Sequence, residues 1–215
     1  MTRQWGRTEA TLGAVAAVLL LALTPGLPLW ARYLVFWAPL VIAVIVALRR
    51  HDTAPADVTS HIAFRITWTD ALVGAFVGLV LRCVMIAIEL LSVGSVTSSS
   101  SLFKVDHNLL WFTTAIIAPV IIAPVVEELF FRGLVLPAIG TNWIGILGSA
   151  IIFSVMHLAY GFDLLTAVST FIVGVVLGAL AVRTKRLGAS ITAHVFYNAS
   201  LIAMSELGGM APFSG

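Results

Sequence analysis

Residues 109–139 read LLWFTTAIIAPVIIAPVVEELFFRGLVLPAI, a long apolar run that indicates the class of fold. It is longer than the about 20 apolar residues that an α-helix needs to cross a bilayer. Pro119, Pro124 and Pro137 interrupt the apolar run. Because proline removes a backbone donor, we expect kinks or breaks rather than one straight rod. The stretch therefore predicts an irregular helix that spans a membrane.

The composition of the whole chain agrees with a membrane protein. The chain has 215 residues, of which 60% are hydrophobic and 10% charged, and its mean hydropathy is +1.06. A soluble domain is about half apolar and a quarter charged, and so short a chain cannot bury the excess in a core. Lipid can cover that excess. We expect one transmembrane domain over residues 1–215, with its motif-bearing half at about 109–206.

Seven apolar segments are long enough to be membrane spans, which predicts an all-α polytopic protein with about seven transmembrane helices. The segments are 10–29, 31–48, 69–93, 109–139, 142–160, 163–182 and 188–206.

The positive charges predict the orientation of these spans, because cytoplasmic loops are enriched in Lys and Arg. With the N-terminus inside, the outer loops hold only Arg32 and Lys104. The inner loops then hold Arg3, Arg7, Arg49, Arg50, Arg65, Arg183, Lys185 and Arg186. No basic stretch is dense enough to follow a phosphate backbone, so nucleic acid is not expected as a partner.

Polar side chains inside spanning helices cost free energy and are by default candidates for a functional site. Three pairs stand out, each with members four positions apart and therefore on one helix face. The pairs are Glu128 with Arg132, Phe153 with His157, and His194 with Asn198. Arg82 and Glu89, seven apart in the segment 69–93, could share a helix face and are interpreted as structural or cavity-lining.

Each pair has an expected geometry. The Glu128 carboxylate can pair with the Arg132 guanidinium, and the Phe153 ring can limit the rotation of His157. Glu127 is about 100° around the helix from Glu128 and can point elsewhere. The helix rise of about 1.5 Å per residue gives the depth of the polar side chains in the membrane. It places them about 9–21 Å from the inner ends of their helices, within the hydrocarbon layer; they are Glu127, His157, His194 and Asn198. We therefore expect one buried cavity lined by Glu127, His157, His194 and Asn198.

This set of side chains suits hydrolysis. Glu127 could take a proton from water, and the resulting hydroxide could attack a peptide carbonyl. Donors from His194 and Asn198 would stabilise the oxyanion. His157 could orient the water or protonate the leaving amine. Glu128, Arg132 and Phe153 would support these residues.

A zinc mechanism uses the same residues differently. His157, His194 and Glu127 would be the ligands, and the neighbouring glutamate would be the base. The familiar His-Glu-x-x-His spacing is absent from the sequence. We therefore expect no cofactor, with zinc as the alternative.

The motifs Glu127-Glu128-x-x-x-Arg132, Phe153-x-x-x-His157 and His194-x-x-x-Asn198 resemble those of the CPBP family. That family comprises the type II CAAX prenyl endopeptidases and the bacterial Abi proteins. The resemblance covers about residues 116–203 and implies a multi-helix intramembrane endopeptidase. It also implies catalytic roles for the first glutamate, both histidines and the asparagine, which are Glu127, His157, His194 and Asn198. Between glutamate and metal mechanisms, the resemblance favours glutamate.

The sequence is therefore interpreted as an intramembrane endopeptidase that hydrolyses a peptide bond in a membrane-associated peptide or protein. Two alternatives remain at this point. One is a non-catalytic membrane protein of the immunity or scaffold type, and the other is a proton-coupled transporter in which Glu127 and His157 relay protons. The expected location is a bacterial plasma membrane, with membrane lipid around the chain and the cavity opening toward the cytoplasm.

Overall fold

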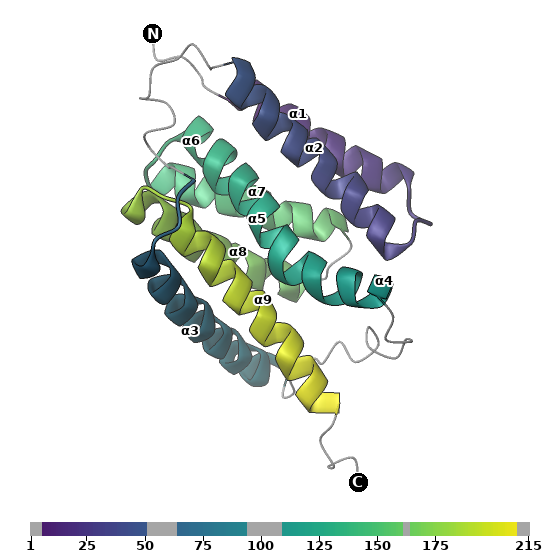
Figure 1. Cartoon of the computed structure of the whole chain (residues 1–215), viewed down its shortest axis with the longest axis vertical. Coiled ribbons are helices and arrows are strands. Elements are labelled where there is room, and N and C mark those ends of the chain that lie inside the picture. Colours follow the sequence, from purple (N-terminus) through teal and green to yellow (C-terminus); the bar gives the residue numbers. More distant parts are fainter. Residues whose placement is uncertain (1–5, 51–63, 94–108, 161–163, 210–215) are drawn as a thin grey trace.

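The computed structural model describes residues 6–50, 64–93, 109–160 and 164–209, which form helices and short turns without strands (Figure 1). The all-α prediction is confirmed. The helices are α1 (Arg7–Leu23), α2 (Leu29–Arg50), α3 (Trp68–Val93), α4 (Leu109–Phe112), η1 (Thr113–Ile122), α5 (Ala123–Phe130), η2 (Phe131–Val135), α6 (Leu136–Ile139), α7 (Trp143–Tyr160), α8 (Leu164–Thr184) and α9 (Gly188–Gly209).

The elements α4 to α6 follow one another without a break and form one helix, Leu109–Ile139, called the central helix below. With this helix counted once, the described residues contain seven helices, as expected. The first predicted segment, 10–29, was placed wrongly at its end. Helix α1 ends at Leu23 because Pro25 and Pro28 follow, and α2 begins at Leu29.

Four helices in the described part of the chain are long and apolar enough to cross a membrane. They are Leu29–Arg50, Trp68–Ile88, the central helix and Leu164–Thr184, and Trp143–Ala159 is a shorter apolar helix. These helices support an integral membrane protein. Seven spans and an inside N-terminus stay predictions. Arg3 and Lys104, which contributed to the charge bias, lie outside the described residues.

The prolines change the hydrogen-bond frame of the central helix without breaking it. The Ala123 N–H donates to the Ala118 carbonyl and the Leu136 N–H to the Phe131 carbonyl, five residues back in each case. These bonds make η1 and η2 π-helical, a form that often occurs at functional sites. The expected irregularity is therefore present as two π segments.

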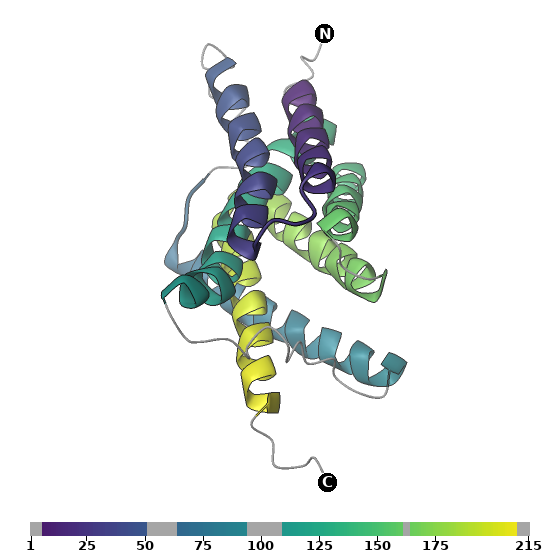
Figure 2. The ribbon, with the colours of Figure 1, turned by 90° about the vertical axis from the view of Figure 1, so that its right-hand side faces the viewer.

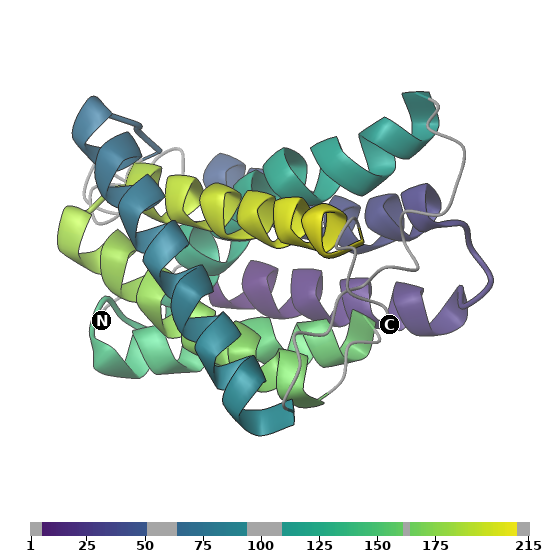
Figure 3. The same ribbon diagram turned by 90° about the horizontal axis from the view of Figure 1, so that it is seen from below.

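Three pairs of helices make the most extensive contacts. They are α1 with α2 and α7 with α8, which are consecutive in the chain, and α3 with α9, which are not. The central helix contacts both α2 and α9 and runs between them in Figure 1. The view turned by 90° shows α7 and α8 on the side of the central helix where α1 also lies (Figure 2). Seen from below, α3 crosses the bundle beside α9 (Figure 3).

Two glycines bring α3 very close to α9. A Cβ atom on Gly74 would lie 2.6 Å from the Ala189 carbonyl oxygen, and one on Gly78 would collide with the Ala193 carbonyl. Small residues four apart let helix backbones approach closely in membranes. This contact positions α9, which carries His194 and Asn198.

Replacing Gly78 with alanine is expected to lower the free energy of unfolding by about 1–3 kcal/mol, because the added methyl group overpacks the contact with α9. Reversible unfolding in detergent micelles measures the change. The matched control is Gly26→Ala, since a Cβ atom there meets nothing within 4 Å; its effect should stay within about 0.5 kcal/mol. Equal effects of the two substitutions would contradict close packing at Gly78.

Candidate active site

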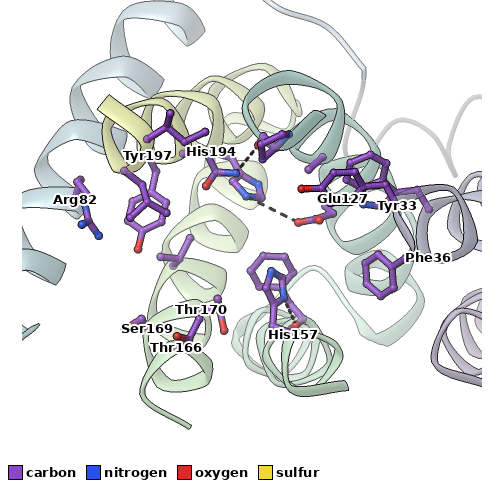
Figure 4. Close-up of a pocket in the computed structure, with 18 of the residues that line it drawn as sticks. Tyr33, Phe36, Arg82, Glu127, His157, Thr166, Ser169, Thr170, His194 and Tyr197 are labelled. Carbon is purple, nitrogen blue, oxygen red and sulfur yellow. Dashed lines mark hydrogen bonds and ion pairs between the residues drawn. The ribbon is translucent and has the colours of Figure 1, made fainter. Parts of the chain in front are cut away.

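One cavity of about 350 Å³ is lined by residues from α2, α3, the central helix, α7, α8 and α9. Its lining contains Glu127, His157, His194 and Asn198. The structure thus brings together the four residues that the sequence singled out. Figure 4 shows Glu127 and His194 on one side of the cavity and His157 below them.

The two consecutive glutamates have different environments. Glu128 is fully buried and does not line the cavity, and its Oε1 lies 2.8 Å from Nη1 of Arg132, which is also fully buried. Glu127 lines the cavity and is 6% exposed. Consecutive helical residues are about 100° apart around the axis, so Glu128 can face its buried ion pair while Glu127 faces the cavity.

Arg132 connects the central helix to two other helices. Its Nη2 donates to the Gly174 carbonyl of α8 at 3.1 Å. Its guanidinium carbon lies 4.7 Å from the centroid of the Phe153 ring of α7, within the range of a cation–π contact. The buried arginine therefore fixes the face of the central helix from which Glu127 projects.

His194 lies between the two glutamates. Its Nδ1 is 3.0 Å from Glu128 Oε1, and its Nε2 is 3.9 Å from Glu127 Oε2. Because a carboxylate accepts hydrogen bonds, Nδ1 is the protonated nitrogen in this contact, and Nε2 faces Glu127. Sequence reasoning assigned Glu128 only to Arg132 and missed this second contact, which joins positions far apart in the chain.

His157 is held by its own helix. Its Nδ1 lies 2.8 Å from the Phe153 carbonyl oxygen. A carbonyl only accepts, so Nδ1 carries the proton and the neutral ring has its lone pair on Nε2. The ring centroids of Phe153 and His157 are 4.4 Å apart, and Phe153 also contacts the His194 ring at 5.9 Å. One aromatic ring thus limits the movement of both imidazoles.

Asn198 closes a gap that the prolines leave in the central helix. Its Nδ2 donates to the Pro119 carbonyl at 2.8 Å. In the π frame of η1, the donor for that carbonyl would be the N–H of residue 124, which is proline and has none. A side-chain amide has two N–H groups, so Asn198 keeps one for the cavity.

Asn198→Leu is expected to lower the free energy of unfolding by about 1–3 kcal/mol, because the Pro119 carbonyl loses its side-chain donor. Pro124→Ala restores a backbone N–H, so the double variant should lose less than Asn198→Leu alone. Unfolding of the wild type, both single variants and the double variant in detergent gives the coupling between the two positions. Strictly additive losses would contradict the proline-gap explanation.

One model of a protein family matches part of the chain. Residues 109–200 match the model described as Type II CAAX prenyl endopeptidase Rce1-like. This segment is Rce1-like. The resemblance predicted from the three motifs is therefore confirmed. No curated protein and no solved structure matches the chain.

The Rce1-like segment contains all four of the residues predicted to be catalytic, and the family supports a membrane protease that acts on membrane-associated peptides. Helices α1, α2 and α3 precede this segment. Of these helices, α2 contributes Tyr33, Phe36 and Trp37 to the cavity, and α3 contributes Arg82. The rings of Tyr33 and Trp37 are stacked, with centroids 4.6 Å apart, so one wall near Glu127 is aromatic.

The zinc alternative needs Glu127, His157 and His194 as a ligand set. In the described ranges, no three His, Cys, Asp or Glu side chains are grouped closely enough to hold a metal ion. The Nδ1 atoms of both histidines are engaged by oxygen acceptors. Any metal contact would therefore come from Nε2 of each ring.

Proposed function

We propose that the protein is an intramembrane endopeptidase that hydrolyses a peptide bond of a membrane-associated peptide or protein with water activated by Glu127. The observation that carries this proposal is one cavity lined by Glu127, both imidazoles and Asn198 inside the Rce1-like segment. Its carboxylate base and its neighbouring donors provide the groups that peptide hydrolysis needs.

The proposed reaction begins when Glu127 takes a proton from water while the water oxygen attacks the peptide carbonyl carbon. The Nε2 lone pair of His157 orients this water. The oxyanion that forms accepts a hydrogen bond from the second N–H of Asn198, and from His194 Nε2 when that ring carries both protons. The C–N bond then breaks, and the proton held by Glu127 goes to the leaving amine, through His157 where geometry requires it.

Glu128 acts in this mechanism as a positioning residue. It binds Nδ1 of His194 and thereby aims Nε2 at Glu127. The same carboxylate is neutralised by Arg132 in a buried pair. A carboxylate that orients an imidazole through Nδ1 is a recurrent arrangement in hydrolases.

The side of the membrane on which the cavity opens stays a prediction. Along α8 and α9 the lining extends toward Leu165 and Ile202. Leu165 lies at the end of α8 away from the turn with Lys185 and Arg186, and Ile202 lies in the half of α9 away from that turn. If that basic turn is cytoplasmic, the lining reaches toward the opposite side, so the expected cytoplasmic opening and the expected inside N-terminus do not support each other.

The test uses the purified protein in liposomes and a farnesylated peptide that ends in a Cys-a-a-X sequence. Mass spectrometry should identify a product cut by the wild type, with little product from Glu127→Gln at the same protein amount. Equal product from both proteins would remove the peptidase proposal. Cleavage that persists after strong chelation, with no metal found by elemental analysis, supports glutamate; loss restored by added zinc supports the metal alternative.

The same liposomes separate the two alternatives that the sequence left open. A folded protein that cleaves nothing supports the immunity or scaffold type. Uptake of peptide that follows an imposed pH gradient supports a proton-coupled transporter.

A further inference from the structure

Arg82 is a buried charge in the cavity wall that the proposed mechanism does not use. It is 3% exposed and lines the cavity. It lies 14 residues along α3 from Trp68, which is about 21 Å from the start of the helix. An ionisable side chain at such a position in an apolar helix marks a functional site by default.

The glycine contact described above places Arg82 at the cavity. Gly74, Gly78 and Arg82 are four residues apart and share one face of α3. The two glycines lie against the α9 backbone, so the next turn brings Arg82 beside Tyr197. The guanidinium carbon is 6.0 Å from the Tyr197 ring centroid, and Figure 4 shows both residues across the cavity from Glu127.

Hydroxyl groups continue this wall. Thr166, Ser169 and Thr170 of α8 all line the cavity, at spacings of three and four that put them on one helix face. Figure 4 shows these hydroxyls between Arg82 and His157. The cavity thus has a cationic, hydroxyl-lined wall opposite the wall that carries the Glu127 carboxylate.

The spacing along α9 gives the offset of these two walls along the axis of that helix. Glu127 faces His194, whereas Arg82 faces Tyr197, and three residues of helix correspond to about 4.5 Å along its axis. One extended peptide residue covers about 3.3–3.6 Å. The volume of about 350 Å³ is at the small end of ligand cavities, which span about 300–1,000 Å³. The cavity therefore suits a short peptide segment.

We propose that Arg82 binds a carboxylate of the substrate that lies within a few residues of the peptide bond to be cut. This proposal rests on the proposed endopeptidase function. A guanidinium presents a planar fork of donors that matches a carboxylate with two parallel hydrogen bonds. The carboxylate belongs either to the C-terminus of the peptide or to an acidic side chain, and the experiment separates these sources.

The experiment uses three farnesylated peptides that differ only at their C-terminal end. The first ends in a free carboxylate, the second in a carboxamide, and the third in a carboxamide with Asp as its last residue. The wild type should cleave the first with a kcat/KM at least about tenfold above the second, as loss of a charged hydrogen bond predicts. Cleavage of the third at the rate of the first shows that an acidic side chain can also supply the carboxylate; cleavage at the rate of the second assigns it to the C-terminus alone.

Arg82→Gln tests the residue itself. The ratio between the free-carboxylate and carboxamide peptides should fall from at least about ten to about one, with the change mainly in KM, and Arg82→Lys should keep part of the ratio. Equal losses for both peptides would show a merely structural role for Arg82. Equal cleavage of all three peptides by the wild type would also overturn the proposal.

Binding of the same peptides to the Glu127→Gln protein separates this proposal from the proposed function. If the wild type cleaves nothing, the endopeptidase proposal fails. A Kd about tenfold lower for the free carboxylate than for the carboxamide, abolished by adding Arg82→Gln, would then still establish the carboxylate site. Equal Kd values for the two peptides would overturn it.

Discussion

Replacing Glu127 with glutamine is expected to lower kcat for peptide cleavage by about 10²–10⁴-fold, the range in which general acid–base catalysis contributes. Glutamine has nearly the shape of glutamate but cannot take a proton from water. The side chain lines the cavity, and its described polar contact is His194 Nε2 at 3.9 Å. The substitution should therefore remove the base and leave the packing in place. Michaelis kinetics in liposomes should show a large fall in kcat with KM little changed.

Glu128→Gln is the matched control, because it makes the same change one residue along the helix. This substitution removes the charge that pairs with Arg132 and the acceptor that orients His194. Its loss of activity should be accompanied by a lower unfolding temperature, whereas Glu127→Gln should unfold like the wild type. Activity of Glu127→Gln within tenfold of the wild type would contradict the assignment of Glu127 as the base.

Arg132→Met is expected to lower the free energy of unfolding by about 3–5 kcal/mol, because it leaves the buried Glu128 charge without its cationic partner. Both side chains are fully buried, and their atoms are 2.8 Å apart. The substitution also removes the hydrogen bond to Gly174. Reversible unfolding in detergent measures the loss.

Two further variants test whether the loss comes from the buried ion pair. Arg50 pairs with Glu9 through a side chain that is 65% exposed, so Arg50→Met should cost no more than about 1 kcal/mol. The double variant Glu128→Leu with Arg132→Met removes both charges and should regain most of the lost stability. It should stay inactive, because His194 loses its acceptor. A loss for Arg132→Met no larger than that for Arg50→Met would contradict a buried ion pair.

Local spacing predicted the parts of the site that one helix determines. Residues four apart share a face, so the Glu128–Arg132 pair and the Phe153–His157 ring contact could be expected from the sequence alone. The seven helices followed from apolar run length in the same way. The π segments were expected only as irregularities, since proline removes a donor without specifying the frame that replaces it.

The sequence predicted that side chains from three helices would line one cavity, but it did not predict which atoms would meet between helices. His194 meets Glu128 across 66 positions, and Asn198 meets the Pro119 carbonyl across 79. These contacts depend on the rotation and tilt of packed helices, which apolar run length does not encode. The position of Arg82 in the cavity likewise required the close approach of α3 to α9. The one indication in the sequence was that an arginine inside an apolar helix is a candidate for a functional site.

A single atom, Oε1 of Glu128, accepts from both Arg132 and His194. A substitution at Glu128, Arg132 or His194 therefore affects the other two residues. The chain could lose hydrolysis through Glu127 alone and keep the bundle, whereas exchange of Glu128 or Arg132 requires a matching exchange of the other.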